Sequence, residues 1–116
     1  MLFRSIAVHK EMGPGLLESV YQHCLAKELT LRGLNIRTEV LIPLIYKGYL
    51  LKKDYFIDIL VEDEIVIELK AVEVILPLHE SQIIGHLKLA NKRLGLLINF
   101  NVPLLKNGFK RFVNNF

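Results

Sequence analysis

The sequence has a single cysteine, Cys24, among its 116 residues. No internal disulfide can form, and no zinc site built on cysteines is possible. No run of about 18 apolar residues occurs, so no membrane-spanning helix is expected. Residues 1–13 lack the apolar block of a signal peptide. We therefore expect a reduced, cytoplasmic protein that does not associate with membranes.

Motifs of several enzyme classes are also missing. The sequence contains no Gly-rich phosphate loop, no dinucleotide fingerprint and no Ser-His-Asp series, and Gly13-Pro14-Gly15 is better explained as a turn. His79 and His86 lie two helical turns apart, but no cysteine or third histidine accompanies them. A histidine zinc site is therefore not expected.

Acidic residues are absent from the last part of the chain, beyond residue 85, while basic residues continue there. The whole chain has a formal charge of +3 and a pI near 9.1. This balance permits an anionic partner such as nucleic acid, although ordinary solvation explains the same charges. The late basic residues are Lys88, Lys92, Arg93, Lys106, Lys110 and Arg111.

The spacing of hydrophobic residues predicts one compact domain over residues 1–116. A short helix at 3–11 should end at the Gly13-Pro14-Gly15 breaker, and a longer amphipathic helix should end at Gly33. The expected strands cover 36–46, 52–61, 65–70 and 94–100, with a helix at 79–92 and a short strand or helical turn at 109–113. This order predicts an α/β sandwich around a mixed sheet.

Two of these strands form a hairpin whose register determines where its charged residues lie. If Glu62, Asp63 and Glu64 form a three-residue loop, Asp58 faces Glu68. Because side chains alternate between faces, Lys70 then joins both acids on one side. The opposite side should carry a core made of Ile57, Ile59, Ile65, Ile67 and Leu69.

This arrangement of Asp58, Glu68 and Lys70 has a definite chemistry. Facing carboxylates repel each other unless a cation lies between them, and Mg²⁺ or Mn²⁺ suits such oxygen ligands. Lys70 would hold an attacking water or a phosphate oxygen, or stabilise the charge that develops on the phosphate. Acids, a lysine and a divalent metal together are typical of phosphodiester hydrolysis.

The same residues carry a resemblance to a known family. Gly15-Leu16-Leu17-Glu18-Ser19-Val20-Tyr21 resembles the naming motif of the GxxExxY family, a branch of the PD-(D/E)XK nuclease superfamily. Asp58 matches the superfamily's acidic strand residue, and Glu68 with Lys70 matches its Glu-x-Lys pair. The segment PLHESQIIGHLK and the ending LGLLINFNVPLLKNGFKRFV also resemble the family's, so the likeness covers nearly the whole chain.

The resemblance implies a restriction-endonuclease-like αβββαβ core, with a mixed sheet flanked by helices, and a role for each matching residue. Glu18, Asp58 and Glu68 would bind Mg²⁺ or Mn²⁺, Lys70 would be the catalytic lysine, and Gln82 would support the ligands or the substrate backbone. His86 stands where related nucleases have a tyrosine, and it is a departure from the pattern. The implied substrate is DNA or RNA.

Each of these residues also has a purely structural explanation. A Glu-x-Lys pair at a strand end is common by chance, and Glu18 would complement the helix dipole as a first-turn acid. Tyr21 lies on the apolar stripe and would pack in the core, while Gln82 would face solvent or partner His79. A non-catalytic module that binds nucleic acid or protein is therefore the alternative. With 116 residues, any sequence specificity would require a partner or a homodimer.

Overall fold

The structure is a computed structural model that describes residues 1–114; for residues 52–54, within a strand, it describes the backbone only. The elements in this part of the chain are α1 (Leu2–Met12), α2 (Glu18–Leu31), β1 (Ile36–Tyr46), β2 (Tyr49–Val61), β3 (Ile65–Lys70), α3 (Pro77–Ala90), β4 (Leu94–Asn99), the 3-10 helix η1 (Leu105–Gly108) and β5 (Phe109–Val113). The predicted order αβββαβ is confirmed from α2 to β4.

The described strands form one five-stranded sheet in the order β1-β2-β3-β4-β5. β3 and β4 run parallel, and the other neighbours are antiparallel, so the sheet is mixed as predicted. For the C-terminal segment the sequence predicts either a short strand or a helical turn, and in the structure it forms the edge strand β5.

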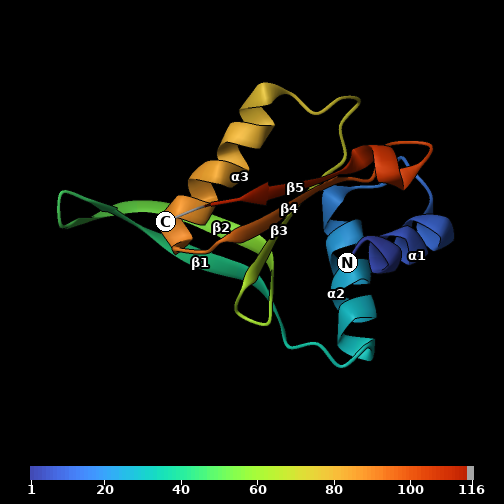
Figure 1. Cartoon of the computed structure of the whole chain (residues 1–116), viewed down its shortest axis with the longest axis horizontal. Helices are drawn as coiled ribbons and strands as arrows, with labels where there is room; N and C mark the ends of the chain where they lie inside the picture. The colour runs from blue at the N-terminus through green and yellow to red at the C-terminus, as the bar shows by residue number, and fades with distance from the viewer. Residues whose placement is uncertain (115–116) are drawn as a thin grey trace.

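Helices cover both faces of this sheet (Figure 1). On one face, α1, α2 and η1 bury a cluster that we call the α2-side cluster. On the other face, α3 buries a smaller one, the α3-side cluster. The α2-side cluster includes Tyr21, Leu25, Leu29, Ile59, Ile67, Leu69, Ile98 and Phe100, and the α3-side cluster includes Ile42, Ile57, Leu60, Val66 and Leu87.

The helix ends follow local signals in the sequence. After α2, Gly33 has a φ of 84°, its amide donates to Thr30, and the Leu34 amide donates to Leu29. This is the paired pattern of a glycine-terminated helix, as predicted. α3 begins at Pro77, two residues earlier than predicted, because proline is well accommodated in the first turn. No helix among the described residues is long and apolar enough to cross a membrane.

The hairpin of β1 and β2 is longer than the sequence predicted. Lys47 and Gly48, with φ values of 49° and 80°, form the two-residue connection, so β2 begins at Tyr49 rather than at residue 52. Positive φ at both central residues matches the twist of antiparallel strands. The hairpin projects at the left of Figure 1, along the molecule's longest extent of 45 Å.

Pairing between β1 and β2 is interrupted at Glu39 and Asp58. The pairs Thr38–Ile59 and Val40–Ile57 flank the interruption, and Glu39 has a φ of 49°. Ile59 packs in the α2-side cluster, whereas Ile57 packs in the α3-side cluster. The prediction that Ile57 shares a face with Ile59 is therefore wrong, because strict alternation does not continue through an irregular position.

Candidate functional site

The register of the β2–β3 hairpin is the one that the sequence predicted. Residues 62–64 form the turn, and the paired residues are Val61–Ile65, Leu60–Val66 and Ile59–Ile67. The ladder ends at Ile59–Ile67, and Asp58 and Glu68 are the next residues of the two strands, without forming a ladder pair. The charge of Glu68 acts on the Asp58 carboxyl group, so the two acids lie near each other beyond the end of the paired region.

Beyond the last backbone pair of the β2–β3 ladder, the side chain of Asp58 accepts a hydrogen bond from β3. The amide of Leu69 donates to Oδ2 of Asp58 at 2.8 Å. In a continued ladder that amide would instead face the carbonyl of Ile57. The backbone carbonyl of Asp58 accepts a hydrogen bond from Nε2 of Gln22, on α2, at 3.3 Å. Asp58 is thus fixed through both its carboxylate and its backbone, and its other carboxylate oxygen has no partner among the described residues.

Burial dominates the electrostatics of Asp58. The pKa of Asp58 is raised from 3.8 to about 6, and the largest cause is the loss of solvent around the carboxyl group. The charges of Glu68 and Glu18 contribute to the rise, whereas the hydrogen bond from Leu69 and the charge of Lys70 oppose it. All three predicted neighbours therefore act on this carboxyl group, and the acids outweigh the lysine.

Glu68 lies in the interior beside α3, with 6% of its surface exposed. Its Oε1 accepts a hydrogen bond from Nδ1 of His86. The His86 ring also packs against Tyr55, with ring centroids 5.3 Å apart. The residue that departs from the family pattern therefore contacts a predicted metal ligand directly and fixes its orientation.

Lys70 ends β3, half-buried, beside Asn99 of the parallel strand β4. Asn99 is 2% exposed, and its amide group bonds both the N–H and the C=O of Val72. These two hydrogen bonds fix the backbone at Val72, two residues after Lys70. Sequence reasoning missed Asn99, although a polar residue at the end of the apolar run LGLLIN is the signal that marks it.

Glu18 is the first residue of α2 and is exposed to solvent. The loop before it is fixed by Tyr21, whose hydroxyl donates to the carbonyl of Gly13 at 2.5 Å and accepts from the amide of Leu16 at 3.1 Å. The Tyr21 ring stacks on Phe100 at 4.4 Å. Tyr21 therefore packs in the core, as expected, and also sets where the helix carrying Glu18 begins.

Gln82 is exposed on α3, one turn before His86. Its side chain makes no hydrogen bond to the described part of the chain. His79, its alternative partner, instead accepts a hydrogen bond from the amide of Leu76 and so caps the start of α3.

No group of three histidine, cysteine, aspartate or glutamate side chains lies close enough to enclose a metal ion, among those that the structure describes. Asp58 and Glu68 nevertheless suit a divalent cation by their chemistry, because two adjacent carboxylates in a partly desolvated place repel each other. Glu18 does not complete a compact triad with them.

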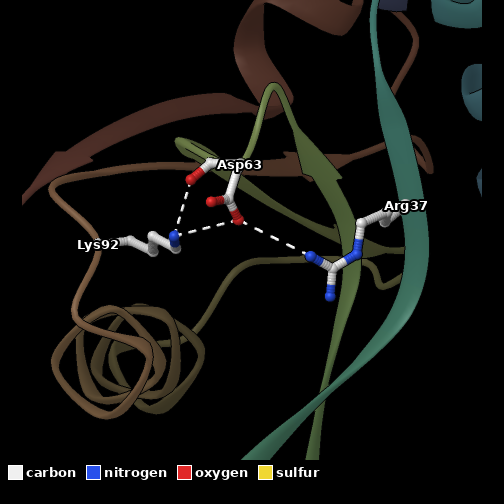
Figure 2. A network of polar contacts seen from close by, with 3 residues as sticks. All are labelled: Arg37, Asp63 and Lys92. Carbon is white, nitrogen blue, oxygen red and sulfur yellow. Dashed lines mark hydrogen bonds and ion pairs between the residues drawn. The ribbon is translucent and has the colours of Figure 1, made fainter.

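A second polar cluster lies at the opposite end of β3 (Figure 2). Nζ of Lys92 contacts Asp63 at its carbonyl, 2.7 Å away, and at Oδ1, 3.3 Å away. Arg37 reaches the same carboxylate at 3.8 Å. Similarly, Nζ of Lys110 pairs with Glu80. Two of the late basic residues are thus already paired within the chain.

The geometry described above agrees with a comparison against protein families. The model of the PD-(D/E)XK nuclease superfamily matches residues 2–112. The chain belongs to the PD-(D/E)XK nuclease superfamily. The comparison with curated proteins found no match, and neither did the comparison with solved structures.

Membership of the PD-(D/E)XK nuclease superfamily explains the fold and limits the function. The mixed sheet with helices on both faces is consistent with the restriction-endonuclease-like fold. A nuclease-like function and a nucleic-acid substrate follow from the superfamily, whose nucleases generally use divalent metal ions.

Proposed function

We propose that this protein is a metal-dependent nuclease that hydrolyses phosphodiester bonds in DNA or RNA. The observation that carries the proposal is the placement of Asp58 beside Glu68, where burial raises the pKa of Asp58 to about 6. A divalent cation at this position would relieve the repulsion between the two acids. The Gly15-to-Tyr21 motif further supports assignment to the GxxExxY branch of the superfamily.

Asp58 and Glu68 would hold Mg²⁺ or Mn²⁺ in this proposal. When bound, such an ion supplies a polarised water and neutralises charge on the phosphate. Glu18 stands at the start of α2 and acts electrostatically on Asp58, so it would join the site at longer range, through water. Leu69 and His86 would orient the two main ligands, since each bonds one carboxylate oxygen.

Lys70 and Gln82 would act on the substrate rather than on the metal. The charge of Lys70 acts on Asp58, which supports a place for its ammonium group near the acids, where it would hold the attacking water or stabilise negative charge in the transition state. Gln82 is free of internal hydrogen bonds to the described residues and would contact the substrate backbone. Residues 1–116 would form one catalytic domain acting in the cytoplasm.

A second candidate function is a catalytically inactive module that binds nucleic acid or a protein partner. One observation favours it: His86 already bonds Oε1 of Glu68 and so takes up one of the lone pairs through which that carboxylate could bind a metal. This reading predicts binding without cleavage.

A cleavage assay with nuclease-free recombinant protein distinguishes the two functions. Single-stranded, double-stranded and branched DNA and RNA are incubated with Mg²⁺ or Mn²⁺, and Glu68→Gln and Lys70→Ala are compared with wild type. We expect cleavage by wild type and losses of at least about 100-fold in both variants. Glu64→Gln, in the exposed turn, is the matched control and should cleave normally. Metal-loaded wild type that leaves every substrate intact would favour the binding module.

A further inference from the structure

The end of the β1–β2 hairpin carries two tyrosines that lie outside both core clusters. Tyr46 and Tyr49 pair across the ladder, on either side of the connection formed by Lys47 and Gly48. They are 59% and 73% exposed. Residues that pair in this way share a face, so the two rings point to the same side of the hairpin. We call Tyr46, Lys47 and Tyr49 the hairpin tip.

The two tyrosines lie on the face of the sheet that α3 covers nearer its centre. Along β1, Ile42 packs in the α3-side cluster, and Tyr46 follows it at an even spacing. The register shift between Pro43 and Leu44 comes from two extra residues on β2, so alternation along β1 continues through it. Glu68 points to the same face, because its carboxylate bonds a side chain of α3. The hairpin tip and this acid therefore lie on one face of the sheet.

The outer part of the hairpin is positively charged. Residues 44–54 include Lys47, Lys52 and Lys53 against a single acid, Asp54. Nζ of Lys47 lies 5.4 Å from the centroid of the Tyr46 ring, within the range of a cation–π contact. Exposed aromatic rings in a cationic segment suit a polyanion whose units also carry flat aromatic groups. Nucleic acid has this chemistry, and it is the substrate that membership of the superfamily implies.

Stacking on these tyrosines requires bases with a free face. Inside a duplex both faces of each base are covered by its neighbours, whereas a single strand can turn its bases outward. Proteins that bind single strands without sequence preference combine aromatic rings for the bases with positive charge for the backbone. The hairpin tip offers both, which favours a single strand over a duplex.

We propose that the hairpin tip binds single-stranded nucleic acid, with bases stacked on Tyr46 and Tyr49 and the phosphates attracted by the positive charge of the hairpin. This inference rests on the proposed function for its partner, and it narrows the substrate class to single strands. At about 3.3 Å per residue, Tyr49 lies roughly 30 Å from Asp58 along β2. A strand of roughly nine stacked nucleotides, at about 3.4 Å each, spans that length.

Fluorescence anisotropy of labelled oligonucleotides tests this proposal in EDTA, where no metal-dependent cleavage occurs. The probes are dT and rU oligomers of about 15 nucleotides and a DNA duplex of the same length. Tyr46→Ile/Tyr49→Ile removes both rings but keeps residues that favour strands, so the hairpin should persist, which circular dichroism checks. We expect this Ile pair to bind the single strands at least about 10-fold more weakly than wild type and the duplex about equally. Binding of dT alone or rU alone would identify the sugar that the site accepts.

Two controls separate stacking from a general loss of structure. Tyr46→Phe/Tyr49→Phe keeps both rings and should bind the single strands as wild type does. Phe3→Ile removes a ring that is 79% exposed on α1, and it should also bind normally. Equal binding by wild type and the Ile pair, an equal loss in the Phe pair, or a wild type that binds neither single strand would overturn the proposal.

Intrinsic fluorescence reports the stacking itself, because a base stacked on tyrosine quenches its emission. The chain has four tyrosines and no tryptophan, and Tyr21 is fully buried while Tyr55 is partly buried. Saturating dT should therefore quench wild type far more than the Ile pair, and unquenched wild-type emission would contradict stacking. Neither readout needs catalysis. Tip-dependent binding without cleavage would reject the nuclease and keep this site, whereas cleavage with normal binding by the Ile pair would reject this site alone.

Discussion

Asp58 accepts the hydrogen bond that the next backbone pair of the β2–β3 ladder would otherwise make. Its carboxylate is therefore held by Leu69 in a partly buried position beside Glu68. A single isolated carboxylate buried in this way would simply be protonated more easily. With a second acid and a lysine acting on it, the group instead becomes sensitive to any cation that enters the site.

The raised pKa of Asp58 predicts how stability depends on pH. Between its unfolded value of 3.8 and its folded value of about 6, the folded protein holds a proton that the unfolded chain has lost. The free energy of unfolding should therefore fall as the pH rises through this window, by about 3 kcal/mol, and stay lower above it. Asp58→Asn keeps an acceptor for Leu69 but carries no charge, so it should be more stable than wild type at pH 7.5 in EDTA.

Urea denaturation of Asp58→Asn and wild type from pH 3.5 to 8 measures this effect. The difference between the two curves should be small below pH 4 and reach its full size above pH 6. Glu64→Gln, in the exposed turn, should follow the wild-type curve. If the difference in unfolding free energy between Asp58→Asn and wild type stayed constant between pH 4 and pH 6, the raised pKa would not belong to Asp58.

Tyr21 connects the core to the loop that precedes Glu18. Tyr21→Phe keeps the stacking on Phe100 but removes the bonds to Gly13 and Leu16, so we expect a loss of about 1–2 kcal/mol in unfolding free energy. If the protein cleaves nucleic acid, its rate should fall as well, because the start of α2 is less firmly placed. Tyr49→Phe, on the exposed hairpin, should leave the denaturation midpoint unchanged.

For helices and strands, features that depend on a few adjacent residues are predicted better than features that depend on contacts between distant parts of the chain. The turn at 62–64 fixed the β2–β3 register, and the Gly33 stop fixed the end of α2, because both depend on a few adjacent residues. The interruption at Glu39 and Asp58 could not be predicted in the same way. It depends on Gln22 from α2 and on Leu69 from β3, which only the folded chain brings to Asp58.

The candidate site shows the same division. Alternation along the strands predicts that Asp58, Glu68 and Lys70 share one side, but strict alternation fails between Ile57 and Ile59, on either side of Asp58. The contacts that orient the two acids come from residues distant in sequence: His86 bonds Glu68, and Gln22 and Leu69 bond Asp58. A pattern read along one strand contains no information about which side chain of another element will pack against it.

Two glycines give a matched test of the packing between elements. A Cβ at Gly108 would lie 2.2 Å from the carbonyl oxygen of Asn99, whereas a Cβ at Gly85 in α3 would meet nothing within 4 Å. Gly108→Ala should therefore cost about 2 kcal/mol or more, because backbone must move. Gly85→Ala should instead stabilise the protein by about 0.5–1 kcal/mol, through the higher helix propensity of alanine. Equal thermal midpoints for the two variants would contradict this packing.

For the whole molecule, the distribution of charge separates the two proposed functions. Lys92 and Lys110 are paired with Asp63 and Glu80, and these ion pairs tie α3 and its C-terminal end to the sheet. They would have to break before these lysines could contact phosphate. The basic end of the sequence therefore offers less to a binding module than its net charge indicates, which makes the acidic site the stronger basis for function.

Metal binding at that site should appear in the stability of the whole molecule. A ligand that binds only the folded state at 100 times its dissociation constant adds about 2.7 kcal/mol, which for a chain of this size raises the thermal midpoint by roughly 10 °C. We expect this rise for wild type when Mn²⁺ is added to EDTA-treated protein. Glu68→Gln should lose most of it, and Lys70→Ala should retain it, because Lys70 does not bind the metal. If Glu68→Gln and Glu64→Gln gained the same rise as wild type, the ion would be binding elsewhere, and the Asp58–Glu68 pair would not be a metal site.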